Sequence, residues 1–173
     1  MENRNFDEIL PKLVKIALFA DFDINDEHDK AILKMVYDNT LIRHYKKGEV
    51  IIKEGDTGDE FYILSQGTVH VSRLTPAGDV IALATLDSSM NIFFGETALI
   101  SDDTRNATVS ALTDCRILVL SSKKFHEMCK KEPVLGYRVL TVLANRMAQT
   151  IRNVNRDKAT LYEALFNEIS AVD

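Results

Sequence analysis

The spacing of apolar residues divides the chain into three regions. In residues 1–40, apolar residues recur at steps of three and four, which is the period of an amphipathic helix. Between residues 41 and 121 they form short runs that end at glycine-containing turns, as expected for strands. The helical period returns in residues 122–173. We therefore predict one domain in which helices flank a β structure.

Capping residues and prolines predict where the helices begin and end. Asn25 is a suitable N-cap for the helix NDEHDKAILKMVYDN, whose first turn is acidic. Pro11 should start or kink the preceding helix. Ser122 is a suitable cap for a short helix, and Pro133 can occupy the first turn of the next. No helix breaker follows Gly136, so we expect one long final helix.

The central region has the strand pattern of an antiparallel barrel. Turn signals stand at Gln66-Gly67 and at TPAGD (75–79), and strands are expected in EVIIK, EFYILS, TVHVSRL, VIALATL and RNATVSALTDCRILVLSS. Short strands at this spacing are typical of a barrel or jelly roll. The predicted fold is thus mainly β, an antiparallel jelly-roll β-barrel with N-terminal helices and two C-terminal helices, one short and one long.

Composition and charge narrow the function classes. The 173 residues are enough for one domain with a sizeable core, and the net charge of −5 argues against nucleic acid as the main partner. No stretch approaches the roughly 20 apolar residues of a membrane span, and the N-terminus lacks the pattern of a secretory signal. Cys115 and Cys129 stand in unlike contexts, which favours reduced thiols in a cytoplasmic protein.

The sequence offers no motif for metal binding or catalysis. The histidines are scattered and form no HxH or HxxxH pair, and His70 falls on the predicted solvent face of its strand: the four are His28, His44, His70 and His126. We find no nucleophile motif, P-loop or zinc spacing. We therefore expect no metal, no cofactor and no enzymatic activity.

The stretch FFGETALISDDTRNATV (93–109) has the chemistry of an anion site. Gly95 precedes a segment that can form one or two helical turns, whose unpaired N–H groups suit a phosphate. A strand is expected to begin at Arg105, on a face that points into the barrel with Ala107, Val109 and Ala111. A guanidinium there needs an anion, and its planar fork fits phosphate oxygens. Glu96 can accept a hydrogen bond from a hydroxyl group.

A purely structural interpretation of the two charges is also open. Glu96 and Arg105 can pair with each other, or Arg105 can pair at the surface with Asp102 or Asp103. Structural ion pairs are common, so the charges alone do not decide between an ion pair and a ligand site.

The same stretch resembles the phosphate-binding cassette of the cyclic nucleotide-binding domain family, which includes catabolite-activator proteins and protein kinase regulatory subunits. The family pattern is F-G-E, a short apolar helix, a loop and R-x-A-T/S-V. It corresponds here to Phe94-Gly95-Glu96, to residues 97–100 (TALI) and to Arg105-Asn106-Ala107-Thr108-Val109. Upstream, KKGEVIIKEGDTGDEFYILSQGTVHV has glycines at the turns expected for the family's first strands. The similarity covers roughly residues 18 to 155.

The resemblance implies roles for individual residues. In the family the cassette glutamate holds the ribose 2′-OH and the arginine holds the cyclic phosphate, which assigns these roles to Glu96 and Arg105. The remaining expected binding residues are Phe94, Gly95, Thr97, Ala98, Asn106 and Ala107. Two departures concern loop shape: DSSMNIF replaces the usual glycine-rich turn, and SDDT lacks the proline often found before the arginine. Asn91 can take the left-handed conformation that glycine would supply.

The resemblance further implies a cyclic nucleotide receptor, with cyclic AMP favoured over cyclic GMP. Relatives that prefer cyclic GMP often have threonine directly after the arginine, where this chain has Asn106. Thr150 on the last helix is the expected base contact. The alternatives are a structural interaction module with a vestigial site, or a regulatory fragment of a larger transcription factor or kinase. The sequence predicts no membrane contact and no direct DNA binding, because no helix-turn-helix pattern fits.

The last helix carries a heptad seam that suggests a homodimer. Its apolar residues follow alternating steps of three and four, and Lys158 is the polar member: Ala144, Met147, Ile151, Val154, Leu161 and Leu165. Up to about residue 150, packing of this stripe on the barrel is the better interpretation. Beyond it, we expect a parallel dimer through residues 147–169. The downstream protein partner is not identified by the sequence.

Overall fold

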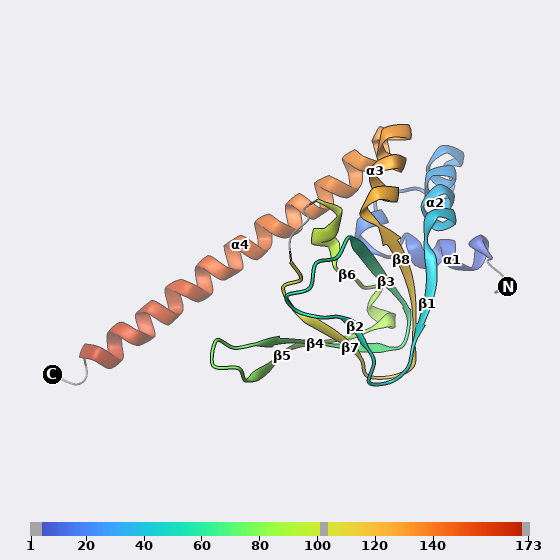
Figure 1. Ribbon diagram of the computed structural model, residues 1–173. Helices are drawn as coiled ribbons and strands as arrows, with labels where there is room; N and C mark the ends of the chain where they lie inside the picture. Colours follow the sequence, from blue (N-terminus) through green and yellow to red (C-terminus); the bar gives the residue numbers. More distant parts are fainter. Residues whose placement is uncertain (1–4, 101–103, 171–173) are drawn as a thin grey trace.

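The computed structural model describes residues 5–100 and 104–170 (Figure 1). The helices are α1 (Phe6–Leu13), the 3-10 helix η1 (Ala17–Phe19), α2 (Glu27–Asn39), the 3-10 helices η2 (Ser88–Met90) and η3 (Glu96–Leu99), α3 (Ser122–Lys131) and α4 (Pro133–Ser170). The strands are β1 (Leu41–Tyr45), β2 (Val50–Ile52), β3 (Glu60–Gln66), β4 (Thr68–Leu74), β5 (Val80–Asp87), β6 (Phe93–Phe94), β7 (Thr108–Ala111) and β8 (Cys115–Ser121).

The strands form two antiparallel four-stranded sheets, in the orders β1-β8-β3-β6 and β2-β7-β4-β5. The sheets face each other, and the helices α1, α2, α3 and the start of α4 lie together beyond the first sheet (Figure 1). The predicted fold class, a mainly β barrel with flanking helices, is confirmed. The predicted turns at Gly67 and Gly78 are also present, both with the positive φ that favours glycine.

The first sheet is covered on both faces, because alternate residues of its strands enter two separate cores. In β8, Ile117 and Val119 face the second sheet, whereas Leu118 and Leu120 pack against the helices. Strand β3 divides its residues in the same way. A strand that is buried on both faces needs apolar residues at consecutive positions. This explains the uninterrupted apolar runs ILVL (117–120) and FYIL (61–64) in the sequence.

Two predicted N-caps were wrong by one residue, and one predicted helix start was wrong. The N-cap of α2 is Asp26, which accepts from the Asp29 N–H, while Asn25 instead donates to Asp23. The N-cap of α3 is Ser121 rather than the adjacent Ser122. Pro11 lies inside α1, so the alternative that the helix starts there was wrong. Adjacent Asn, Asp and Ser residues are all good caps, so local sequence does not choose among them.

Helix α4 begins at Pro133, as predicted, and has two dissimilar halves. Its first half buries Leu135, Val139 and Leu143 in the core beneath the first sheet. The second half projects away from the body (Figure 1), and the described side chains from Ile151 onward are exposed. The interpretation that the heptad stripe packs on the barrel up to about residue 150 was wrong, since Ala144 and Met147 are exposed too.

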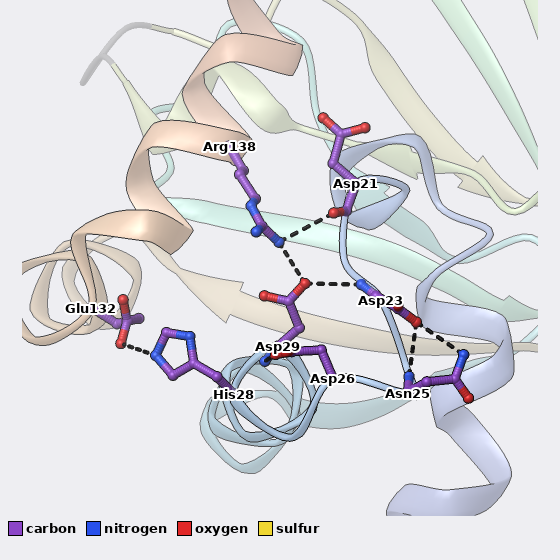
Figure 2. Close-up of polar contacts among 8 residues, drawn as sticks. All are labelled: Asp21, Asp23, Asn25, Asp26, His28, Asp29, Glu132 and Arg138. Atoms are coloured by element: carbon purple, nitrogen blue, oxygen red, sulfur yellow. Dashed lines mark hydrogen bonds and ion pairs between the residues drawn. The ribbon is translucent and has the colours of Figure 1, made fainter.

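A polar network attaches the start of α4 to the N-terminal helices (Figure 2). Arg138 donates to the carboxylate of the buried Asp29 at 2.7 Å and to the carbonyl of Asp21 at 3.1 Å. Its guanidinium also lies over the ring of Phe22, 4.6 Å from the centroid. Burial acts to raise the pKa of Asp29, but hydrogen bonds from Arg138 and from the Asp23 N–H lower it overall. The pair therefore stays ionised and holds α2 and α4 together.

Candidate functional site

A cavity of about 540 Å³ opens between the two sheets and α4. This volume lies within the range of about 300 to 1,000 Å³ that is usual for small-molecule sites. Most of the predicted binding residues line it: Phe94, Gly95, Glu96, Thr97, Arg105, Asn106 and Ala107. Ala98 is buried beside it. The structure thus brings the cassette together around one cavity.

Thr150 does not line this cavity. It lines a neighbouring space of about 240 Å³ between η3 and α4, and its hydroxyl donates to the carbonyl of Arg146 in its own helix. Arg146, one turn earlier on α4, lines both spaces. The residue of the last helix that faces the main cavity is therefore Arg146, which the sequence analysis did not identify.

Gly95 shapes the entrance to the cassette. Its φ of 72° is left-handed, and it precedes the four-residue 3-10 helix η3, which is the short helical segment of one or two turns that we expected. A side chain at this position would also be tightly confined. A Cβ would lie 3.0 Å from an Arg105 nitrogen and 3.1 Å from the ring of Tyr62, so these neighbours would have to shift. The backbone conformation and the limited space therefore both favour glycine.

Asn91 takes the left-handed conformation that the sequence suggested, with φ 53°. It is the C-cap of η2, and its left-handed backbone turns the chain toward β6. The loop at residues 101–103, which includes Asp102 and Asp103, lies outside the described residues.

Arg105 is buried at the back of the cavity, with 7% of its surface exposed. Strand β7 begins at Thr108, so the prediction that a strand begins at Arg105 was wrong. The backbone of Arg105 is held instead by the loop before β3: its N–H donates to the carbonyl of Asp56, and its carbonyl accepts from Gly55. These bonds fix the direction in which the side chain enters the barrel.

The guanidinium of Arg105 is surrounded by carbonyls and an aromatic ring. One terminal nitrogen donates to the carbonyl of Glu60 at 2.6 Å and the other to the carbonyl of Gly95 at 3.2 Å. The ring of Tyr62 lies below it, at 5.8 Å. Within residues 5–100 and 104–170, Arg105 makes no ion pair. A buried cation held by carbonyls alone is well prepared to receive an anion.

Glu96 pairs with α4 rather than with Arg105. Its carboxylate lies 3.5 Å from the guanidinium of Arg146. That guanidinium lies over the ring of Phe93, 4.6 Å from its centroid. The structural alternative, a mutual pair of Glu96 and Arg105, is therefore not what the structure contains. The sequence did hold a signal for Arg146, because it continues the buried stripe of Leu143 at helical spacing.

The only group of possible metal ligands in the described part of the chain lies far from this cavity. Asp26, His28 and Asp29 each offer one ligand atom, and these atoms lie within 4.8 Å of one another. All three residues already have partners (Figure 2): Asp26 accepts from the Asp29 N–H, His28 contacts Glu132, and Asp29 accepts from Arg138. The group is part of the network that anchors α4.

The cysteines and helices add two further observations. Cys115 and Cys129 are both free thiols. Burial raises the pKa of Cys129, which keeps that thiol protonated and unreactive.

Among the helices in the described ranges, none combines the length and apolar character needed to cross a membrane.

Comparison with known proteins identifies relatives of this chain. The sequence model described as the cyclic nucleotide-binding domain matches residues 42–132. The cAMP-dependent protein kinase regulatory subunit of Dictyostelium discoideum is 34% identical over 87 residues, 50% of this chain and 27% of that protein. The cGMP-dependent protein kinase of Plasmodium berghei is 30% identical over 158 residues, 88% of this chain and 16% of that protein. The chain therefore spans less than a third of the length of either relative.

A solved structure shares the fold of the whole domain. The crystal structure of a cyclic nucleotide-binding domain from Methylobacillus flagellatus superposes with a TM-score of 0.70 and covers 86% of this chain and 79% of that chain. Its sequence identity is 24%, so this likeness supports the architecture and not the details of the site.

Proposed function

Because this chain belongs to the cyclic nucleotide-binding domain family, we propose that it is a non-catalytic receptor for cyclic AMP. One observation carries the proposal. Arg105 is buried at the end of a cavity of about 540 Å³ with carbonyls as its hydrogen-bond partners and no ion pair to any described residue. Such a site gains most from an anion of the size of a phosphate.

The proposed pose follows the positions of the two charges. The cyclic phosphate binds the guanidinium of Arg105, and the ribose 2′-OH donates to Glu96. The remaining cassette residues, Phe94, Gly95, Thr97, Ala98, Asn106 and Ala107, shape the site around them. The base then lies toward α4, where Arg146 and, beyond it, Thr150 stand. The single domain supplies every group in this pose.

The preference for cyclic AMP rests on one position. Asn106 follows the arginine, where relatives that prefer cyclic GMP often have threonine. The names of the relatives do not indicate which nucleotide is preferred, because one is named cAMP-dependent and another cGMP-dependent. Calorimetry with both nucleotides tests the preference, and tighter binding of cyclic GMP would overturn it.

The ion pair between Glu96 and Arg146 gives the proposed receptor an output. The ribose hydroxyl approaches the same carboxylate that pairs with Arg146 of α4, 3.5 Å from its guanidinium. Binding therefore changes the partners of Arg146 and, with them, the position of α4. A ligand acts on a conformation only through contacts that differ between two states, and this pair is such a contact.

The exposed half of α4 is proposed to form a parallel homodimer through residues 147–169. The apolar residues of its seam are all exposed: Met147, Ile151, Val154, Leu161 and Leu165. Lys158, the polar member, lies with its amine 5.5 Å from the ring of Tyr162. Burial of such a stripe against a second copy is the usual fate of a heptad seam. A monomer in light scattering at tens of micromolar would exclude this dimer.

A thermal-shift measurement tests the receptor itself. A cyclic nucleotide at about 100 times its dissociation constant should raise the free energy of unfolding by about 2.7 kcal/mol. A melting curve unmoved by millimolar cyclic AMP and cyclic GMP would refute the receptor and leave a structural interaction module with a vestigial site.

A further inference from the structure

A second arginine, Arg43, forms the closest two-point ion pair described in the chain. Its two terminal nitrogens donate to the two carboxylate oxygens of Glu60, at 2.6 and 2.5 Å. Arg43 lies on β1 and Glu60 is the first residue of β3, and both strands pair with β8. The arginine therefore reaches across a whole strand to bind the carboxylate. The pairing of the strands does not require this contact.

Glu60 also contacts the proposed phosphate site, but through its backbone. Its carbonyl accepts from Arg105 at 2.6 Å, while its carboxylate is turned to Arg43. The hydroxyl of Tyr62 donates to the same carboxylate at 3.0 Å. Burial acts to raise the pKa of Glu60, but the bonds from Arg43 and Tyr62 lower it overall. An ionised carboxylate thus belongs to a residue that already touches the cation of the site.

Space for a competing contact exists beside these residues. A cavity of about 270 Å³ is lined by Glu60, Tyr62 and Arg105 together. Arg105 also contributes to the low pKa of Glu60 through its charge. Without Arg43, the carboxylate of Glu60 would be a negative group on a flexible side chain next to a buried cation that has no carboxylate partner in the described residues.

From this geometry we propose that Arg43 is a positioning residue for the ligand site: it holds the Glu60 carboxylate away from Arg105, so that Arg105 meets the phosphate and not an internal anion. This inference rests on the proposed function, because it concerns the availability of Arg105 for a ligand. It assigns Arg43 no contact with the ligand. The pair suppresses an inhibitory contact that the fold would otherwise allow.

Calorimetric titration of cyclic AMP into single and double variants tests the proposal. Arg43→Met should weaken binding by about tenfold, because phosphate must then displace the Glu60 carboxylate from Arg105. Glu60→Gln alone should bind within about threefold of the wild type, since its carbonyl remains. The double variant should recover to about the same level, because no carboxylate is left to compete. A merely structural role for Arg43 predicts no such recovery.

Two further variants control for lost stability. Arg73→Met removes another arginine–glutamate pair, with Glu54, on the second sheet and should leave affinity unchanged. Arg43→Lys keeps the charge but not the two-point contact, and should weaken binding less than Arg43→Met does. If Arg43→Met melts too low to be titrated, Arg43→Lys with and without Glu60→Gln carries the same test. Wild-type affinity in the Arg43 variants, or no recovery on adding Glu60→Gln, would overturn the proposal.

A structure of the ligand-free Arg43→Met variant separates this inference from the receptor function. It should show the Glu60 carboxylate within ion-pair distance of Arg105, whether or not the wild type binds cyclic AMP. A wild type that fails to bind would refute the receptor, whereas an unmoved Glu60 would refute the role of Arg43.

Discussion

Arg105 and Arg138 are held in nearly the same way at two distant places in the molecule. Each donates to a backbone carbonyl, of Glu60 or of Asp21, and each lies against an aromatic ring. The difference is that Arg138 also meets the buried carboxylate of Asp29, whereas Arg105 makes no ion pair within the described ranges. The first arrangement is complete and holds two helices together. The second would be completed by the phosphate of the proposed ligand.

From this comparison we predict that removal of Arg105 lowers ligand affinity, whereas removal of Arg138 lowers folding stability. Arg105→Ala should weaken cyclic nucleotide binding by about 30-fold to several thousandfold, because the ligand phosphate loses its charged partner, at a cost of roughly 2 to 5 kcal/mol. Its ligand-free melting temperature should change little. Calorimetry and melting curves measure the two effects. Arg105→Lys should also bind poorly, since an ammonium cannot present two parallel donors. A large loss of ligand-free stability with unchanged affinity would reverse the assignment.

Arg138→Met should instead destabilise the fold and spare the site. It leaves Asp29 buried without its cation, and we expect a loss of about 2 to 3 kcal/mol in the free energy of unfolding. This is below the usual cost of breaking a buried pair, because the Arg138 side chain is 28% exposed. Affinity for cyclic AMP at a temperature where the variant is folded should stay within about threefold. Denaturant unfolding measures the stability, and an unchanged midpoint would contradict the structural role.

Glu96→Gln should cost less free energy of ligand binding than Arg105→Ala does, and less than Arg138→Met costs in stability. The amide oxygen still accepts from a hydroxyl, so we expect roughly a tenfold loss of affinity for cyclic AMP. The variant should also show a reduced preference for ribose over 2′-deoxyribose ligands, because a neutral acceptor binds the hydroxyl less strongly than a carboxylate does. Titration with cyclic AMP and its 2′-deoxy analogue checks both statements. If the preference survives in full, the 2′-OH does not bind Glu96.

The smallest expected effect concerns the Asp29–Arg138 pair, which should change how the melting temperature depends on pH. Because the folded pKa of Asp29 is lowered, its contribution is complete above the unfolded pKa of about 4 and is lost as pH falls through the folded value. Asp29→Asn should therefore flatten the fall in melting temperature between pH 6 and pH 3. Asp38→Asn, which removes an exposed pair with Lys34 on the same helix, is the control and should leave that fall unchanged.

The sequence predicted the elements of the fold better than their ends. Strand alternation and turn glycines identified the barrel, because the burial of a sheet face determines which neighbouring residues in a strand are apolar. The caps at Asp26 and Ser121 were missed by one position, since an equally good cap stands beside each. Pro11 does not start its helix, because α1 already begins at Phe6, where the Asn5 side chain supplies the cap.

In the candidate site, the residues of the contiguous motif could be predicted from the sequence, but their contacts with distant segments could not. Glu96 and Arg105 were found because their motif is contiguous in sequence. Their actual partners, Arg146 and the carbonyl of Glu60, come from segments far along the chain. Arg43 was likewise invisible, since its role depends on a contact that spans β8. Pairings of this kind follow from the packing of elements and not from any local pattern.

Because α4 is long, a small tilt of the helix at the cavity would move its C-terminal end by a much larger distance. The helix is fixed to the body near Arg138 and meets the cassette at Arg146, and its remaining turns are exposed. From Arg146 to Ser170 the helix measures about 36 Å at a rise of about 1.5 Å per residue. A tilt of about 10° at the cassette would displace the far end by about 6 Å, by the geometry of a rigid rod of that length. In the proposed receptor the helix therefore acts as a lever arm: its short end lies at the ribose site, and its far end moves by more than the rise of one helical turn.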